Sequence, residues 1–366
     1  MGGALALTLL LAAPAQLALA AGAKDVFTVA DVPLDATAAS ANAARDAARV
    51  DGERRAYAQL FSRLTLAADH DRMPAANEAM LNDLISGFEV AKERSSSVRY
   101  LANYTFHFRA AAMRDLLKKA GVPFAETPSR PLVVLAVSEG GAAPVLWDDP
   151  NPWRDAWGAH PPAPGLVPLI LPVGDLEDVQ AIAAEAAVAG DDGGLKAISE
   201  HYGGADVLVA RVRLDTAVAP HTLAATSTRF SIATAQPPES WTKSFAAAAG
   251  ESDGDLLGRV VASTAAQVEE AWKQANILDF KHTGTIVVRV PAPDLQSWVA
   301  VRDRLTGIPA IARSELVSID RSEARVAIHY VGDPAQLRVA LAQRDLELQG
   351  DDPDFVLAQR GSGAPH

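Results

Sequence analysis

Cysteine is absent from all 366 residues of the sequence. This absence excludes disulfide bonds, thiol nucleophiles, iron–sulfur clusters and zinc sites built on cysteine. It also excludes lipid attachment through the cysteine that tethers bacterial lipoproteins. The fold is therefore expected to be indifferent to the redox state of its compartment.

A basic surface is also missing, because the formal net charge is −12 and no run of Lys and Arg interrupts the acidic background. Binding to a polyanion requires a concentrated basic surface, so the composition argues against nucleic acid as a partner. The same argument disfavours anionic membranes. Hydrophobic residues make up 49% of the chain, which is ample for packed cores, and the length predicts two or three domains.

Short motifs of catalysis and of cofactor binding are missing as well. The sequence has neither a glycine-rich phosphate loop nor an H-E-x-x-H pattern,. His70 lies between Asp69 and Asp71, but three consecutive side chains cannot converge on one metal ion,. Ser199 and His201 fall two apart on a predicted helix and hence on different faces,. We therefore predict no catalytic residue, no cofactor and no metal.

The first residues, MGGALALTLLLAAPAQLALAAGAK, read as a secretory signal. An apolar stretch begins at Ala4, and A-x-A cleavage sites follow at residues 18–20 and 21–23,. Pro14 makes the stretch a poor membrane span. The Lys or Arg that usually stands near the start of such a signal is missing. We predict a signal peptide over residues 1–23, export to a bacterial periplasm, and no integral membrane span after its removal.

The segment 24–127 is predicted to be a small α+β domain. Apolar residues at three- and four-residue spacings predict one long helix, with its inner stripe at Ala43, Ala47, Val50, Tyr57, Phe61 and Leu64,. VRYLANYTFHFR alternates as a strand does, and the helix AAAMRDLLKKAGV follows it and ends at Gly121,.

The segment 128–278 is predicted to be an α/β sandwich. PLVVLAV and LVPLILPV are continuous apolar runs, typical of strands buried on both faces of a sheet,. DLEDVQAIAAEAAVAG predicts a helix capped by Asp175, and LLGRVVASTAAQVEEAWKQA predicts a long one,. ADVLVARVRL predicts a strand that leads into an antiparallel region, and the alternation of strands and helices indicates the sandwich.

The segment 281–350 is predicted to be a ferredoxin-like domain. TIVVRVP, AIARSELVSID, EARVAIHYV and LELQ predict four strands, and two helices capped by Asp294 and Asp333 lie between them,. The resulting order β-α-β-β-α-β is that of the ferredoxin-like fold. The tail at residues 351–366 is expected to be disordered.

RVAIHYVGDPAQL brings His329, Tyr330 and Asp333 close together in sequence, as a catalytic or metal-binding group would be. Successive side chains of a strand point to opposite faces, so His329 and Tyr330 cannot cooperate, and Asp333 is explained as a helix cap. Arg289, Arg325 and His329 share the face that the two helices leave uncovered. We predict that this face is solvated or is an interaction surface for a neighbouring domain or partner.

WDDPNPWRDAW carries a cluster of three tryptophans, Trp147, Trp153 and Trp157. Asn151 and Pro152 predict the start of a short helix that places Trp153 and Trp157 one turn apart. Such a cluster forms a ligand or glycan platform or a docking surface in some proteins. The interpretation we favour is that it anchors the helix on the sheet.

Five stretches together resemble the DUF2066 family of uncharacterised bacterial envelope proteins. They are FHFRAAAMRDLLKKAGVPF, RPLVVLAV, LWDDPNPWRDAW, GLVPLILPVGDLEDVQAI and HYGGADVLVARV, and the resemblance covers most of residues 25–275. It implies an envelope protein but no agreed activity, cofactor or site. The succession of a small α+β and an α/β domain is also similar to the flagellar H/T-ring component, whose middle domain resembles the TolB N-terminal domain.

These observations lead to three functional hypotheses. The first is an exported, non-catalytic module that binds an envelope protein partner or helps to assemble an envelope complex. The second is a periplasmic hydrolase whose two carboxylates are brought together only by folding, since such pairs leave no short motif. The third is a small-ligand or glycan receptor built on the tryptophan cluster. The partner and the oligomeric state are left open.

Overall fold

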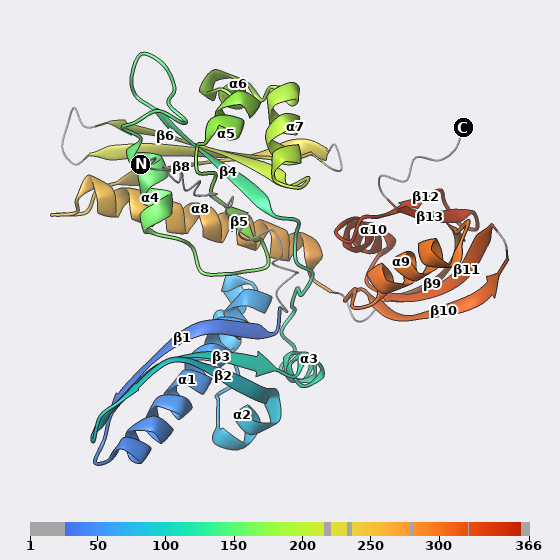
Figure 1. The fold of residues 1–366 in the computed structure, drawn as a ribbon, viewed down its shortest axis with the longest axis horizontal. Coiled ribbons are helices and arrows are strands. Elements are labelled where there is room, and N and C mark those ends of the chain that lie inside the picture. The colour runs from blue at the N-terminus through green and yellow to red at the C-terminus, as the bar shows by residue number, and fades with distance from the viewer. Residues whose placement is uncertain (1–25, 216–220, 233–235, 279–281, 321, 360–366) are drawn as a thin grey trace, which may run out of the picture.

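The computed structural model describes residues 26–215, 221–232, 236–278, 282–320 and 322–359. The protein is a multidomain α+β structure with three β-sheets, one in each of the three predicted segments (Figure 1). The predicted signal peptide lies outside the described residues. Within the described ranges, no helix combines the length and the apolar character that crossing a membrane requires.

The N-terminal domain packs a long helix across a three-stranded antiparallel sheet of order β1-β3-β2 (Figure 1). Its elements are β1 (Thr28–Thr37), α1 (Ala41–Leu64), the 3-10 turn η1 (Ala67–Arg72), α2 (Glu78–Leu84), β2 (Ile85–Ser95), β3 (Arg99–Phe108) and α3 (Ala110–Lys119). Helix and sheet approach closely at Gly52, where an added Cβ would lie 2.4 Å from a methyl carbon of Leu34. This contact explains a glycine inside a helix, where its backbone freedom is otherwise unfavourable.

The predicted stripe of α1 is only partly right. Tyr57, Phe61 and Leu64 are buried, but in the first half the buried residues are Ala44, Ala48 and Gly52 rather than Ala43, Ala47 and Val50. In an alanine-rich segment several helix faces look equally apolar, so periodicity alone does not select the buried one.

The central domain is a five-stranded sheet with helices on both faces, with strand order β5-β4-β6-β7-β8. Its elements are β4 (Leu132–Glu139), α4 (Pro152–Ala159), β5 (Leu169–Ile170), α5 (Leu176–Ala181), α6 (Ala184–Ala189), α7 (Asp192–His201), β6 (Asp206–Asp215), β7 (Thr222–Ser231), β8 (Gln236–Ala246) and α8 (Asp253–Asn276). Strand β4 is parallel to β5 and β6, while β6, β7 and β8 are antiparallel.

Strand β4 contributes side chains to two separate hydrophobic cores, as its continuous apolar run predicts. Leu132, Val134 and Ala136 pack with α4 and α8, whereas Val133 and Leu135 pack on the side of α5, α6 and α7. Figure 1 shows the two groups of helices on opposite sides of the sheet. Alternate side chains of this buried strand thus point to opposite faces of the sheet, and helices cover both faces, which gives the predicted α/β sandwich.

The C-terminal domain has the predicted order of elements along the chain but one strand more. Its elements are β9 (Thr283–Pro291), α9 (Leu295–Leu305), β10 (Ile311–Ile319), β11 (Glu323–Val331), α10 (Pro334–Ala342), β12 (Leu346–Gln349) and β13 (Phe355–Gln359). The sheet order is β10-β11-β9-β13-β12, with β13 parallel to β9.

The expectation of a disordered tail from residue 351 is wrong for residues 355–359, which form β13. Phe355 and Leu357 of this strand are buried in the core of the domain. The prediction of disorder rested on the composition of the tail. Two apolar side chains at alternate positions are nevertheless enough to give the strand one buried face. Residues 360–366 lie outside the described residues.

The predicted cap of α10 is confirmed. The carboxylate of Asp333 accepts hydrogen bonds from the backbone N–H groups of Ala335 (2.6 Å) and Gln336 (3.0 Å). The Gln336 side chain in turn accepts from the backbone N–H of Asp333, which completes a capping box,. Asp333 is thus a structural residue rather than part of a catalytic group.

Replacing Asp333 with alanine is expected to lower the free energy of unfolding by about 1 kcal/mol, because two N–H groups of α10 lose their acceptor. Urea denaturation followed by circular dichroism measures this. Asp333→Asn keeps a capping oxygen and serves as the control. An equal loss in both variants would contradict the capping role.

The last turns of α8 join the N-terminal domain to the central one. The Nζ of Lys273 donates to the carbonyl oxygens of Ser62 (3.1 Å) and Thr65 (2.6 Å), at the end of α1. The indole N–H of Trp272 donates to the carbonyl oxygen of Thr127 at 2.7 Å. Lys273 is buried, so these contacts satisfy a charge that would be costly in isolation.

Candidate functional site

Two of the three clustered tryptophans are core residues. Trp153 is 1% exposed and Trp157 is 3% exposed, and their rings pack edge to face at 5.6 Å between centroids. The indole N–H of Trp153 donates to the carbonyl oxygen of Ala210 on β6 at 2.9 Å. A receptor platform that uses all three tryptophans is therefore wrong, and the anchoring of α4 on the sheet is confirmed.

Trp147 lies on the opposite side of the domain and is half-buried. Its indole N–H donates to the carbonyl oxygen of Ile182, the C-cap of α5, at 2.7 Å. A Cβ added at Gly174 would lie 3.3 Å from its ring, and Gly174 has φ +76°, which also favours glycine,. Trp147 thus lies against both ends of the segment that carries α5, next to Gly174 before the helix and next to Ile182 at its end.

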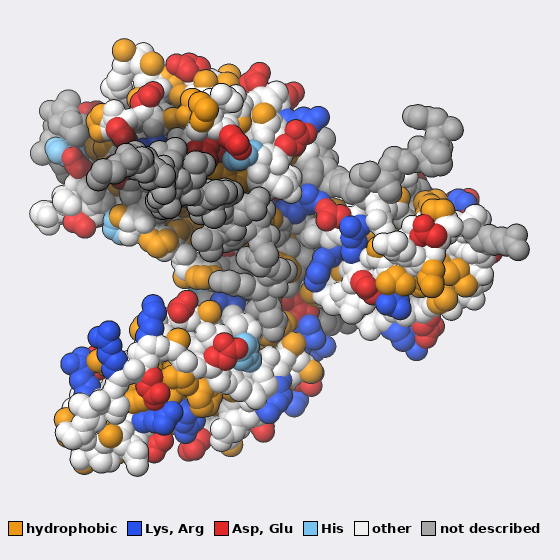
Figure 2. All heavy atoms as spheres, viewed as in Figure 1, with side chains coloured by type: hydrophobic (Ala, Val, Ile, Leu, Met, Phe, Trp, Pro, Cys, Tyr) orange, Lys and Arg blue, Asp and Glu red, His pale blue; other side chains and the backbone are white. Residues whose placement is uncertain are grey.

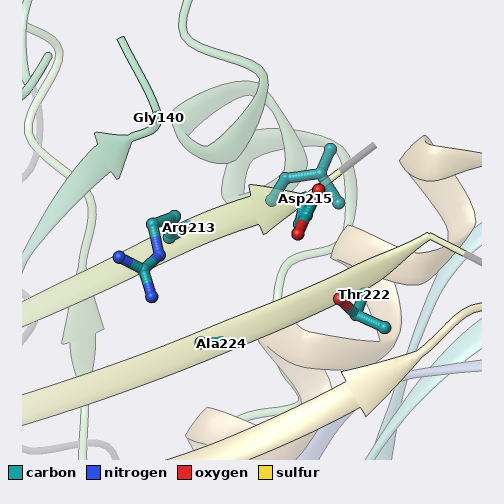
Figure 3. A pocket seen from close by; sticks show the side chains of 6 residues that line it. Gly140, Arg213, Asp215, Thr222 and Ala224 are labelled. Carbon is teal, nitrogen blue, oxygen red and sulfur yellow. The ribbon is translucent and has the colours of Figure 1, made fainter. Parts of the chain in front are cut away.

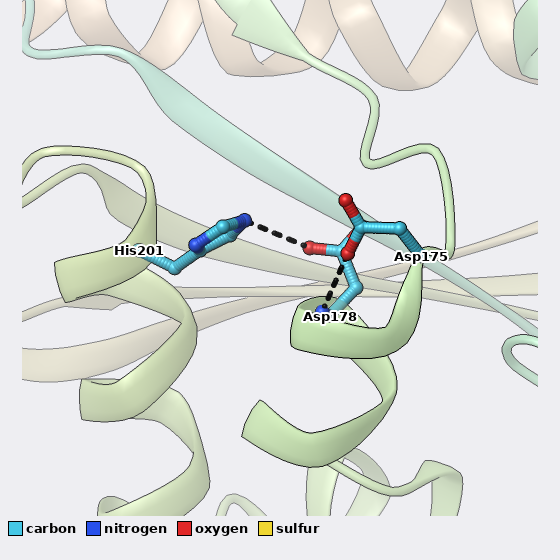
Figure 4. Close-up of side chains that lie close together, drawn as sticks. All are labelled: Asp175, Asp178 and His201. Carbon is cyan, nitrogen blue, oxygen red and sulfur yellow. Dashed lines mark hydrogen bonds and ion pairs between the residues drawn. The ribbon is translucent and has the colours of Figure 1, made fainter. Parts of the chain in front are cut away.

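A cluster of two carboxylates and an imidazole lies next to this segment (Figure 4). Asp175 is the N-cap of α5, Asp178 lies in the first turn of this helix, and His201 is the last residue of α7. One ligand atom from each of the three lies within 4.8 Å of the others. The sequence predicts Asp175 only as a helix cap, and no local pattern in it connects His201 with either carboxylate.

Asp178 is fully buried, at 0% exposure. Its Oδ2 accepts hydrogen bonds from the backbone N–H of Gly174 (2.9 Å) and the hydroxyl of Tyr202 (3.2 Å). Its Oδ1 is also buried and accepts no hydrogen bond from any described residue. A buried carboxylate oxygen without a donor is costly, so this atom requires an explanation.

The ring of His201 lies between two carboxylates. Its Nδ1 is 3.2 Å from Oε2 of Glu177, and its Nε2 is 3.6 Å from Oδ1 of Asp178. The adjacent Tyr202 ring packs edge to face on His201 at 4.8 Å. Burial raises the pKa of the Tyr202 hydroxyl, and its bond to Asp178 acts in the same direction, so Tyr202 stays a neutral donor,. The position of the imidazole is therefore set on both sides.

Arg289, Arg325 and His329 lie together on the outer face of the C-terminal sheet, as predicted. Arg289 and Arg325 are directly opposite each other on β9 and β11, and both are exposed. His329 pairs with the hydroxyl of Thr285 (2.9 Å) and lies 3.3 Å from a guanidinium nitrogen of Arg313. Two like charges placed opposite each other on one sheet face repel, which favours an acidic group over them.

Two hollows occur in the central domain. The first, of about 290 Å³, lies at the carboxyl ends of β4 and β6 and is lined by Gly140, Arg213, Leu214, Asp215, Thr222 and Ala224 (Figure 3). The second, of about 320 Å³, lies between α6 and strands β6 to β8. Among the described residues, each hollow is lined by one carboxylate, Asp215 in the first and Asp192 in the second. Neither holds the carboxylate pair that the hydrolase hypothesis requires.

Exposed large apolar side chains occur at several places in the described residues, and two of these places hold three such side chains each. One is β10, where Leu316, Val317 and Ile319 are exposed, Val317 at 59%. The other is the α5 segment, where Val173, Leu176 and Val179 are exposed, Leu176 at 71%. Figure 2 shows hydrophobic side chains gathered over α5 and α6 at the top of the view. Contiguous exposed apolar groups are typical of interaction sites.

Comparison with known proteins adds little to this description. No family model and no curated protein sequence matches the chain. A solved structure, lipoprotein GNA1162 from Neisseria meningitidis, matches at 19% identity and a TM-score of 0.25, and covers 38% of this chain and 96% of that one. A likeness at this TM-score carries no argument about the fold or the function.

Proposed function

We propose that the protein is an exported, non-catalytic module that binds another protein of the bacterial envelope through strand β10. The observation that carries this proposal is an unpaired edge strand with exposed apolar side chains. Strand β10 pairs with β11 on one side and forms an edge of its sheet on the other. A free edge of this length is a template onto which an extended segment of another protein adds as a further strand.

The two edges of the sheet differ in the way this proposal requires. Strand β10 spans nine residues, of which Leu316, Val317 and Ile319 are exposed. Strand β12, at the opposite edge, spans four residues, and its exposed side chains are Glu347 and Gln349. A short polar edge resists pairing, whereas a long apolar one invites it unless it is covered.

The charge of the neighbouring face indicates the chemistry of the partner. Arg289 and Arg325 are exposed on the outer face beside β10, and Arg313 is exposed on β10 itself, although the whole chain carries a net charge of −12. Arg313 and Arg325 also pair with Glu315 (3.0 Å) and Glu323 (3.4 Å). An extended segment with apolar and acidic side chains would pair with the edge and also neutralise these arginines. The predicted interaction residues of the C-terminal domain therefore belong to this proposal, while Trp153 and Trp157 do not.

A photo-crosslinking amino acid placed at Val317 is expected to give a covalent adduct with one envelope protein in bacteria that express the chain. The same amino acid at Glu347, on the other edge of the sheet, is the matched control and is expected to give none. Adding Arg325→Glu to the Val317 probe should reduce the adduct, because the partner segment is acidic. Equal adducts at both edges, or none above an unrelated exported protein, would overturn the proposal.

The family and the location belong to the same proposal. The stretches that resemble DUF2066 proteins, together with the N-terminal signal pattern, support a protein of that family in the periplasm,. The three-layer central domain supports a TolB-like relationship, and the element order of the C-terminal domain supports a ferredoxin-like one,. Both are likenesses of architecture and carry no activity with them.

A further inference from the structure

We propose that Asp175, Asp178 and His201 form a binding site for a divalent transition-metal ion that joins α5 to α7. This inference is independent of the proposed binding at β10. It starts from the two ring nitrogens of His201. Nε2 lies close to Asp178, as Figure 4 shows, and Nδ1 lies close to Glu177. A neutral imidazole carries one N–H, so one of its nitrogens presents a lone pair to a carboxylate oxygen.

A metal ion at Nε2 would remove this conflict while Nδ1 faces Glu177, whose side chain is exposed. If Nδ1 donates to Glu177, the lone pair of Nε2 and the orphan Oδ1 of Asp178 face each other across 3.6 Å. A metal ion between the two atoms would accept both lone pairs.

The distances fit a metal ion. Zinc bonds to histidine nitrogen and carboxylate oxygen at about 2.0–2.2 Å, so two ligand atoms of a tetrahedral site are roughly 3.4 Å apart. The observed 3.6 Å between Nε2 and Oδ1 is close to this value. The third ligand atom, from Asp175, lies within 4.8 Å of both, and a side-chain adjustment of about 1 Å would bring it into the same shell.

The surroundings resemble the second shell of known metal sites. A histidine that binds a metal usually donates its other N–H to a carboxylate, and Glu177, whose Oε2 is 3.2 Å from Nδ1, is the carboxylate nearest to that position here. The non-ligating oxygen of Asp178 is held by Gly174 and Tyr202. These two hydrogen bonds orient the carboxylate so that the orphan Oδ1 faces the position of the ion.

The chemistry of the three ligand side chains indicates which class of ion the site would bind. Two carboxylates and one imidazole suit Zn²⁺ and its first-row neighbours, whereas Ca²⁺ and Mg²⁺ prefer all-oxygen shells. The site has three protein ligands, and water would complete the coordination. The ion would tie the six-residue helix α5, which carries the exposed Leu176, to the end of α7.

The test is calorimetric titration of the full chain, prepared without a histidine tag and stripped of metal, with Zn²⁺. One equivalent is expected to bind, and the midpoint of thermal unfolding should rise by about 5 °C or more at roughly a hundredfold excess over the dissociation constant. Ca²⁺ and Mg²⁺ are expected to give neither effect.

Two variants and one control assign the binding to this site. Asp175→Asn keeps a capping side chain at α5 but loses a ligand charge, and His201→Gln loses the imidazole. Each is expected to weaken Zn²⁺ binding at least about tenfold. His221→Gln removes another histidine paired with an aspartate, at 2.7 Å from Asp253, and should leave the binding unchanged.

Absence of saturable Zn²⁺ binding by the unmodified chain would overturn the proposal. Equal affinity in Asp175→Asn would overturn it as well, since that variant is expected to keep its fold, which circular dichroism checks. Neither result bears on the crosslinking at β10, so the two proposals fail separately.

Discussion

Replacing Trp153 with alanine is expected to lower the free energy of unfolding of the central domain by about 3–5 kcal/mol. The side chain is among the largest that are fully buried in the described residues. The loss combines the transfer of the indole from water, the cavity left between α4 and the sheet, and the carbonyl of Ala210 left without its donor,. Urea denaturation followed by far-UV circular dichroism measures this loss.

Trp241→Ala is the matched control, because Trp241 lies on β8 and is only partly buried. Its loss should be clearly smaller. Trp153→Phe keeps most of the buried area and should recover most of the stability. If Trp153→Ala unfolds no more easily than Trp241→Ala, the anchoring role of the helix tryptophan is wrong and a binding role returns to consideration.

Replacing Arg229 with methionine is expected to destabilise the central domain by about 3–5 kcal/mol. Arg229 on β7 and Asp206 at the start of β6 are both buried, and their ion pair measures 2.9 Å. Removing the guanidinium leaves the carboxylate of Asp206 buried without a countercharge. The guanidinium also lies 5.2 Å from the ring centre of Trp272 on α8, so the sheet loses a contact with this helix,.

The double variant Asp206→Leu/Arg229→Met should recover most of the loss, because a buried ion pair is often no more stable than an apolar pair of similar volume. Five of the six tryptophans lie in the central domain, so tryptophan fluorescence during denaturation reports mainly on its unfolding. The exposed pair Asp35–Arg99 on the N-terminal sheet is the control, and Arg99→Met should have little effect,. Additive losses in the double variant would contradict this account.

The elements that sequence patterns predicted well are those with one unambiguous buried face. Strand β4 is a continuous apolar run, β11 alternates strictly, and the caps Asp175, Asp294 and Asp333 each precede a helix that the structure shows. Local sequence was sufficient to predict these elements, because the hydrophobic periodicity and the capping residue are both encoded within a few positions.

The elements that the sequence patterns did not predict lack one unambiguous buried face. Strand β2 is an edge strand whose side chains are mostly exposed, so its sequence shows no alternation,. The run LVPLILPV forms only the two-residue strand β5, because apolar residues also pack in loops. The contact of Asp178 with His201 joins two helices, and helical periodicity describes one helix at a time,. Nothing local in the sequence marks such a pair.

The position of β13 has a consequence for how the chain matures. Strand β9 is the first strand of its sheet to be synthesised, but one of its two neighbours, β13, is the last. Until residues 355–359 are available, one edge of β9 has no partner, and β12, which pairs only with β13, has no place in the sheet. The sheet of the C-terminal domain is therefore completed only by the last strand to be synthesised, and until then β9 has an open edge on which another chain could pair.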